Sequence, residues 1–516
     1  MPDATPASPP GSLDEMLRMA PFDDHNQELI ANVRPPDWTN PEPDGRYNLV
    51  AIGAGTAGLV SAAGAAGLGA RAAVIERRFM GGDCLNVGCV PSKGVISAAR
   101  AWHAARRARS EFGGPTCVDD ADFGAAMERM RRLRAGISHH DSAERFAGLG
   151  VDVYLGHARF TSSDTLEVDG KQLRFRRAVI ATGGRAAAPP IPGLGEIDYL
   201  TNETIFSLTD LPVRLGVIGG GPIGCEMAQS MARFGSRVTL FDMADHVLPR
   251  EDADAADVVQ DALVSDGVEL VLNARINEVV ASGATKRVRY ELDDGVVREV
   301  DVDALLVAVG RKPNVENLGL DVAGVKHGAQ GVEVDDFLRT SNRRVYACGD
   351  VASRHQFTHT ADAQARIVIQ NALFHGRARV SKLVVPWCTY TSPEIAHVGM
   401  YEGEARAAGR QVTTITVPFA EVDRAVLDGE GRGFLRVHHE KGRILGATMV
   451  AEHAGDMIGE LALAITVGIR LSQISGTIHP YPTQAEIIRK VGDAYRRTGL
   501  TPLTKKLLRV WFRLFG

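Results

Sequence analysis

Residues 47–76 read YNLVAIGAGTAGLVSAAGAAGLGARAAVIE and contain the pattern that decides the fold. A short apolar run leads into Gly53-x-Gly55-x-x-Gly58, an alanine-rich helical segment follows, and a second apolar run ends at Glu76. Glycines in this spacing permit a tight turn and let a pyrophosphate approach the N–H groups that begin the helix. An acid roughly 20 residues further on accepts a hydrogen bond from a ribose hydroxyl. The stretch therefore predicts a βαβ dinucleotide-binding unit.

The same order of features occurs a second time further along the chain. Gly219-x-Gly221-x-x-Gly224 follows another apolar run, and Asp242 ends the next one. Two complete fingerprints predict two bound dinucleotides, and a flavin with a nicotinamide is the economical pair. Asp242 can hold a free 2′-hydroxyl but repels a 2′-phosphate, so we expect NADH to be preferred over NADPH. Arg250 could still reach a phosphate, which leaves NADPH as the alternative.

Length and composition indicate a globular protein of several domains. The chain has 516 residues, too many for one hydrophobic core, and is 45% hydrophobic and 23% charged.

The uncharged stretch 49–70 is long enough to cross a bilayer, but its glycines favour a buried strand, loop and helix. After Pro386, strand patterns give way to a helical pattern, which predicts an α+β third domain. The net charge of −5 gives no case for nucleic acid as a partner.

The chemistry is expected in residues 81–93, which read GGDCLNVGCVPSK. Four residues separate Cys84 from Cys89, and this spacing suits one turn near a helix start, where the dipole favours a thiolate. The cysteine spacings and the Pro-rich start predict a reduced, cytoplasmic protein with one functional dithiol and no structural metal. Three of the other thiols are expected to pack in the core: Cys225, Cys348 and Cys388.

This cysteine segment resembles the active-site signature of the class I pyridine nucleotide–disulfide oxidoreductases. Dihydrolipoyl dehydrogenase, glutathione reductase and mercuric reductase belong to that family. Further motifs of the family recur in order: ATGG at 181–184, GRKPN at 310–314 and ACGDV at 347–351. The resemblance runs from about residue 47 to about residue 492. It implies an α/β fold with two Rossmann-like dinucleotide-binding domains and a C-terminal α+β dimerisation domain, and hence a homodimer that contains FAD.

The resemblance also implies roles for single residues. Cys89 would be the charge-transfer thiol beside the flavin, and Cys84 the interchange thiol that faces the substrate. Lys93 would lie near flavin N5, paired with Glu226. Hydride would pass from NADH to FAD, and electrons from there to the disulfide and the substrate. Further cofactor-binding residues fall in the family motifs: Gly82, Thr182, Gly183, Gly310 and Asp350, the last at the ribityl–phosphate part of FAD.

These motifs suggest how the chain is divided. A short helix is expected at 13–19. The expected parts are a Pro-rich extension at 1–45, the FAD-binding domain with the dithiol at 46–200, the NAD(P)-binding domain at 201–311, a return to the FAD domain at 312–384, the dimerisation domain at 385–499 and a basic amphipathic tail at 500–516.

One C-terminal motif departs from the family pattern. Disulfide and dithiol enzymes of the family carry His-x-His-Pro-Thr-x-x-Glu there, contributed across the dimer interface. The matching stretch begins at His479 and keeps the carboxylate, Glu486, but has Tyr481 where the base histidine should be. A phenol of pKa about 10 cannot deprotonate a thiol efficiently at neutral pH, so lipoamide or glutathione turnover is expected to be poor.

Tyrosine at this position is what mercuric reductases have, and their substrate is a soft cation that binds thiolates and needs no general base. The C-terminal cysteine pair of those enzymes has no match, because the last cysteine is Cys388. The sequence therefore predicts a mercuric-reductase-like enzyme that passes electrons to Hg(II) or a similar soft electrophile at Cys84 and Cys89. The alternatives are a dihydrolipoyl-dehydrogenase-like disulfide reductase, and a membrane-surface flavoprotein that reduces a quinone or a protein partner.

The tail after Pro502 reads LTKKLLRVWFRLFG. Lys505, Arg509 and Arg513 recur every four residues, which places them on one face of a helix. We expect this short segment to dock onto the dimer, and peripheral contact with an anionic membrane surface is the alternative. The apolar residues lie largely elsewhere on that helix: Leu503, Leu507, Trp511, Leu514 and Phe515.

Overall fold

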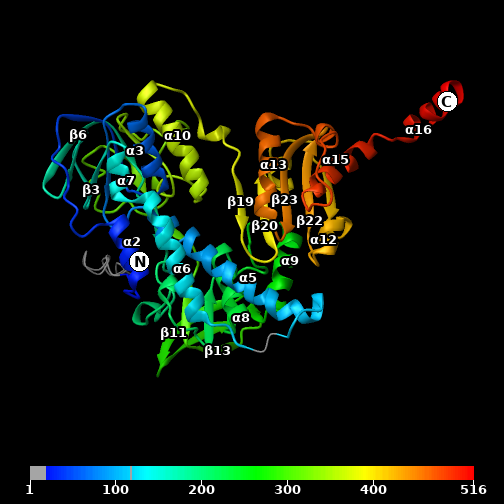
Figure 1. Cartoon of the computed structure of the whole chain (residues 1–516), viewed down its shortest axis with the longest axis horizontal. Helices are drawn as coiled ribbons and strands as arrows, with labels where there is room; N and C mark the ends of the chain where they lie inside the picture. Colours follow the sequence, from blue (N-terminus) through cyan, green and yellow to red (C-terminus); the bar gives the residue numbers. More distant parts are fainter. Residues whose placement is uncertain (1–18, 117–118) are drawn as a thin grey trace.

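The computed structural model describes residues 19–116 and 119–516. Figure 1 shows these residues as packed α/β units, with a helix at the C-terminal end that extends away from them. The helix expected at 13–19 lies, except for its last residue, outside the described part of the chain.

The first unit is built on a sheet in the order β3-β2-β1-β6-β5-β4, with β18 beside β6. Strand β1 pairs in parallel with β2 and with β6 and is almost fully buried, which explains its continuous apolar sequence. Helix α3 connects β1 to β2, as the first glycine fingerprint predicts. The bounds are β1 Arg46–Ile52, α3 Thr56–Gly67, β2 Ala72–Glu76, β3 Val151–Leu155, β4 Arg159–Ser162, β5 Thr165–Val168, β6 Lys171–Ile180 and β18 Val345–Ala347.

The chain leaves this sheet after β6 and returns to it later. Strand β18 pairs with β6, and α10 (Thr358–Phe374) then packs against α3. Helix α10 therefore begins next to the first glycine loop although it follows that loop by some 300 residues of sequence. This return brings the family's third motif, ACGDV, to the edge of the sheet where the glycine loop lies.

The second unit contains a parallel sheet in the order β10-β9-β8-β14, which carries the second glycine fingerprint between β8 and α8. An antiparallel sheet, β11-β12-β13, is appended to it. The bounds are β8 Arg214–Ile218, α8 Pro222–Phe234, β9 Arg237–Phe241, α9 Ala253–Ser265, β10 Val268–Val271, β11 Arg275–Ser282, β12 Thr285–Glu291, β13 Val297–Val302 and β14 Ala304–Val307. Short strands β7 (Gly184–Ala186) and β15 (Arg311–Pro313) pair at the crossing between the two units.

The third unit is an antiparallel sheet, β19-β20-β23-β22-β21, against which α13 and α15 pack. This is the α+β arrangement that the sequence predicts after Pro386. The bounds are β19 Pro386–Thr389, β20 Glu394–Gly399, α11 Glu402–Ala407, β21 Thr413–Pro418, α12 Asp423–Leu427, β22 Phe434–Glu440, β23 Arg443–Ala451, α13 Ala454–Val467, α14 Leu471–Ile474, α15 Glu486–Thr498 and α16 Pro502–Phe515.

Part of the N-terminal extension is a structural component of the first unit. Helix α2 (Asp24–Val33) starts at Asp23, whose side chain accepts from the N–H of Asn26 at 2.9 Å. Leu29 and Val33, one turn apart, are fully buried in the core of that unit. The sequence pattern did not predict this helix, because the prolines around it suggested an irregular segment.

A long helix, α5 (Cys89–Phe112), continues directly from the dithiol and packs against α6 (Phe123–Ser138) and α8. The uncharged stretch 49–70 resolves into β1, the glycine loop and α3, as expected. Among the described residues, no helix is long and apolar enough to cross a membrane.

Candidate active site

A large cavity of about 2260 Å³ lies between the two glycine loops and the dithiol segment. Residues from all three units line it, including Cys84, Cys89, Lys93 and Glu226. All other residues that we predicted to bind cofactor also line it, with two exceptions among the described residues. These exceptions are Gly58 and Gly224, which stand behind the loops.

The first glycine loop has the geometry of a dinucleotide cradle. Gly53 has a φ of 99°, which L-residues rarely adopt, and a Cβ on Gly58 would lie 1.8 Å from the Gly53 carbonyl oxygen. The Glu76 carboxylate accepts from the N–H groups of Ala54 and Arg78, both at 2.7 Å. The acid is thus held at the loop, where a ribose would meet it, so the residues present fit the adenosine end of a dinucleotide.

The second loop repeats this construction. Gly219 has a φ of 106°, and a Cβ on Gly224 would lie 1.9 Å from the Gly219 carbonyl oxygen. The Asp242 carboxylate accepts from the N–H groups of Gly220 and Ala244, the latter at 2.8 Å. Arg250 lines the same cavity, so the cation that could bind a 2′-phosphate remains near this loop.

The dithiol lies where the short helix α4 (Gly82–Asn86) ends and α5 begins. Gly82 allows this segment to approach the first glycine loop, because a Cβ there would lie 2.6 Å from the Cα of Gly55. Cys84 is half-buried, and Cys89 is the first residue of α5. The segment is therefore packed directly against the cradle expected to hold the flavin nucleotide.

The two thiols have different acidities. A hydrogen bond from Cys84 lowers the pKa of Cys89 to about 6, with further help from the Thr358 hydroxyl at 3.4 Å and the Lys93 charge. The same hydrogen bond, together with burial, raises the pKa of Cys84. At neutral pH Cys89 is therefore the thiolate and Cys84 the proton donor to it.

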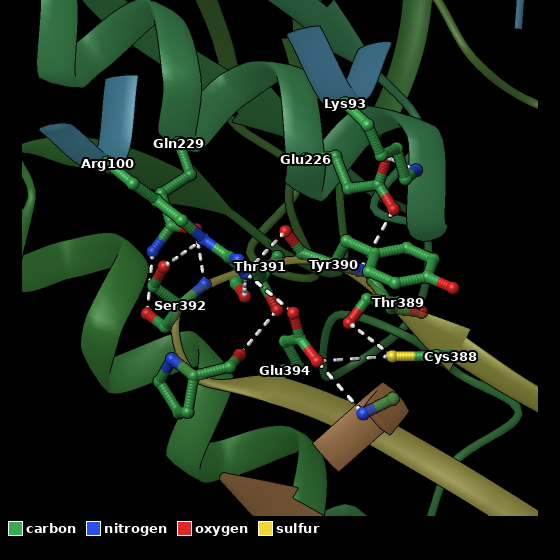
Figure 2. Close-up of polar contacts among 12 residues, drawn as sticks. Lys93, Arg100, Glu226, Gln229, Cys388, Thr389, Tyr390, Thr391, Ser392 and Glu394 are labelled. Carbon is green, nitrogen blue, oxygen red and sulfur yellow. Dashed lines mark hydrogen bonds and ion pairs between the residues drawn. The ribbon is translucent and has the colours of Figure 1, made fainter. Parts of the chain in front are cut away.

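An ion pair joins α5 to α8 beside the dithiol. Lys93 Nζ lies 2.9 Å from Glu226 Oε2, and Glu226 is buried. Figure 2 shows the second carboxylate oxygen of Glu226 accepting from the N–H of Tyr390 at 2.9 Å. The Tyr390 ring lies under the Lys93 ammonium, 4.3 Å from ring centre to Nζ. The buried carboxylate is therefore fully partnered, as a buried charge must be.

Tyr390 is a site residue that the sequence did not identify. It lies in the third unit, 164 residues from Glu226, and lines the cavity. Cys388, two residues before it, packs against the core of the third unit, as expected, but it is only half-buried and also lines the cavity. Cys225 and Cys348 are buried as expected. Burial beside Glu394 raises the pKa of the Cys388 thiol, so it stays protonated.

A second missed residue, Arg311, belongs to the GRKPN motif. Its Nε lies 3.2 Å from the Asp350 carboxylate, and the same guanidinium bonds Asp83 next to Cys84. Burial raises the pKa of Asp350, and the Arg311 charge opposes that shift. Arg311 thus links the dithiol segment to the ACGDV motif.

Tyr481 and Glu486 lie apart from this cavity. Tyr481 is 69% exposed, and its hydroxyl donates to Asp423 at 3.0 Å. Glu486, the first residue of α15, is buried and paired with Arg489 at 2.5 Å. Neither side chain lines the cavity of its own chain. They lie on the third unit, where Ile478 is also 94% exposed.

Two family models match the chain. Residues 47–365 match the pyridine nucleotide-disulphide oxidoreductase family, and residues 385–491 match its dimerisation domain. The chain belongs to this family of FAD-dependent pyridine nucleotide–disulphide oxidoreductases. The third unit accordingly corresponds to the dimerisation domain of the family.

The relatives of this chain carry names that denote several different activities. A mercuric reductase of Bacillus cereus is 36% identical over 87% of this chain and 71% of its own length. A dihydrolipoyl dehydrogenase of Geobacillus stearothermophilus is 33% identical over 88% of this chain and 97% of its own. Among solved structures, the HOCl-induced flavoprotein disulfide reductase RclA of Escherichia coli superimposes with a TM-score of 0.77 at 30% identity, covering 87% of this chain and 99% of its own. Similarity therefore establishes the family and leaves the electron acceptor open.

Proposed function

We propose that this enzyme uses NADH to reduce a soft metal cation, most simply Hg(II), at Cys84 and Cys89. The observation that carries the proposal is Tyr481 in the position of the family's catalytic base. A disulfide substrate needs a base that moves protons on and off thiols, and a phenol does this poorly at neutral pH. A thiophilic cation needs thiolates and no base.

The acidities of the two thiols favour binding of a soft cation as substrate. Cys89, with a pKa of about 6, presents a thiolate at neutral pH, and a bound cation would displace the remaining proton from Cys84. When bound, FAD supplies two-electron transfer between the nicotinamide and the dithiol. The overall reaction, NADH + Hg(II) → NAD⁺ + H⁺ + Hg(0), is balanced and leaves both thiols as they began.

Similarity to proteins of known activity gives limited support to a metal cation as the electron acceptor. Mercuric reductases are among the relatives with 34–36% identity, and RclA has been solved as a Cu(II) complex. Thiolates prefer soft cations, and Cu(I), the one-electron reduction product of Cu(II), is one of them. Dihydrolipoyl dehydrogenases are similarly close, so a disulfide reductase is the second candidate. Tyr481 disfavours that candidate, because it stands where a disulfide reductase needs a general base.

We further propose that the site is completed by the partner subunit of a homodimer. Tyr481 and Glu486 would lie at the partner's cavity, which explains why an exposed tyrosine and an exposed isoleucine occur on a dimerisation domain. We also propose NADH as the preferred donor, because the Asp242 carboxylate at the second glycine loop repels a 2′-phosphate. A kcat/KM for NADPH equal to or above that for NADH would refute this preference.

A comparison of acceptors tests the proposal. NADH oxidation by the purified holoenzyme is followed with a thiol complex of Hg(II), lipoamide, oxidised glutathione and a soluble quinone in turn. We expect kcat/KM for Hg(II) to exceed that for either disulfide by about 100-fold, the scale of a missing general base. Lipoamide turnover as fast as Hg(II) turnover would favour the disulfide reductase. Quinone turnover that survives Cys84→Ser would favour a flavoprotein that does not need its dithiol.

A further inference from the structure

The C-terminal helix α16 (Pro502–Phe515) is unusual because it offers a complete amphipathic surface to solvent. It is well defined at its start, where Thr501 accepts from the N–H of Thr504 at 3.2 Å and Pro502 occupies the first turn. Every residue of α16 except Thr504 is exposed, including Trp511 at 58% and Phe515 at 70%. Figure 1 shows the helix directed away from the dimerisation domain.

The charges and the apolar side chains of α16 are separated around the helix. At 3.6 residues per turn its cations fall on one side and its large apolar residues on the other. The sequence contains no acidic residue after Asp493, although the whole chain has a net charge of −5. The cations are Lys505, Lys506, Arg509 and Arg513, and the exposed apolar residues are Leu503, Leu507, Leu508, Val510, Trp511, Phe512, Leu514 and Phe515.

We propose that α16 binds the surface of a membrane that contains anionic lipids. A helix of 14 residues is roughly 21 Å long, too short to cross the hydrocarbon core of about 30 Å, so it would lie in the interface. The apolar side would enter the acyl boundary, and Lys and Arg would extend to phosphate headgroups. This charge complementarity favours an anionic lipid over a second copy of the same acid-free helix.

The position of α16 suits this role. It follows an exposed connection, residues 499–501, and projects from the third unit rather than lying over the cavity. The helix can therefore meet a flat surface while nicotinamide and substrate still reach the site from solution. The proposal does not depend on which electron acceptor the enzyme uses, because it concerns where the enzyme is held.

Vesicle co-sedimentation of the holoenzyme tests the proposal. Vesicles of phosphatidylcholine alone are compared with vesicles that also contain phosphatidylglycerol, at low and high salt. We expect the full chain to bind the anionic vesicles at least about tenfold more strongly than the neutral ones, and less strongly in high salt. Δ502–516 should not bind. Equal sedimentation of the full chain and Δ502–516 would overturn the proposal.

Two double substitutions separate the two halves of the surface. Trp511→Ser with Phe515→Ser, and Lys505→Gln with Arg509→Gln, should each lower the partition coefficient at least about tenfold. Val296→Ser with Val297→Ser, and Lys326→Gln with Arg343→Gln, change exposed residues elsewhere and should bind as the parent does.

Light scattering of the same proteins tests the alternative that α16 docks onto the dimer instead of a membrane. We expect Δ502–516 to remain the same oligomer as the full chain. A truncated protein that becomes monomeric while the full chain ignores anionic vesicles would assign α16 to the dimer instead. Neither readout involves turnover, so the lipid proposal and the Hg(II) proposal can fail separately.

Discussion

The Lys93 ammonium lies 2.9 Å from the Glu226 carboxylate, and this ion pair ties the helix that starts at the dithiol to the helix that starts at the second glycine loop. Glu226 also accepts from the Tyr390 N–H, so it joins all three units of the chain at one carboxylate. One buried carboxylate therefore contacts elements from each side of the cavity between the loops.

We predict that Glu226→Ala destabilises the protein by about 1–3 kcal/mol, because it leaves the Tyr390 N–H and the Lys93 ammonium without their partner. Glu226→Gln keeps an acceptor for the N–H and should recover part of the loss. Urea unfolding of the apoprotein measures both variants. Equal stability of Glu226→Ala and the parent would show that this carboxylate does not hold the units together.

The acidity of Cys89 can be measured directly in the reduced protein. Thiolate absorbance, and the rate of alkylation by iodoacetamide, should rise as pH passes through about 6 and then level off, instead of rising near pH 8.5 as for a free thiol. Cys84→Ala removes the donated hydrogen bond and should raise the pKa of Cys89 by at least about one unit. Thr358→Val should shift it in the same direction by less. A midpoint above pH 8 in the parent would contradict the assigned thiolate.

Tyr481→His restores the residue that disulfide-reducing members of the family use as a base. We expect lipoamide turnover to increase at least about tenfold, since general-base catalysis contributes on this scale or more. Tyr481→Phe is the matched control and should leave lipoamide turnover low. If Tyr481→His gives no gain while the dimer is intact, the proposal that this position serves the partner's thiols is wrong.

Arg34 links the N-terminal helix to the first dinucleotide loop. Its guanidinium donates to the carbonyl oxygens of Arg77 and Arg78 at 3.1 and 2.8 Å, directly after Glu76. We predict that Arg34→Ala weakens FAD binding about tenfold, because the backbone that presents the ribose-binding acid loses two charge-assisted hydrogen bonds. FAD titration of the apoprotein by flavin fluorescence gives the dissociation constant. Arg132→Ala, at an exposed position on α6, is the control and should bind FAD as the parent does.

Local patterns predicted the parts of the site that depend on local geometry. The glycine loops, Glu76 and Asp242 each belong to one βαβ unit, so spacing alone is enough to predict that each acid lies beside its loop. Tyr390 and Arg311 were missed because their roles arise from contacts with Glu226 and Asp83 across 164 and 228 residues of sequence. The spacing of residues along the chain does not predict contacts between segments so far apart in sequence.

The two terminal helices show two different things that a sequence pattern does not predict. Helix α2 has too few residues to give a clear helical period, and its stability comes from burying Leu29 and Val33 against the first unit. Helix α16 has a complete amphipathic pattern, so the sequence predicted the helix well. The pattern could not choose between the dimer and a membrane, since both would cover the same apolar face.

The most direct test of the proposed function is the ratio of mercury vapour released to NADH consumed by the dimeric holoenzyme under anaerobic conditions. We predict equimolar Hg(0) and NAD⁺ in the parent, and no Hg(0) from Cys84→Ser or Cys89→Ser proteins that still bind FAD. NADH oxidation without Hg(0), or Hg(0) formation that persists in both serine variants, would contradict reduction of Hg(II) at this dithiol.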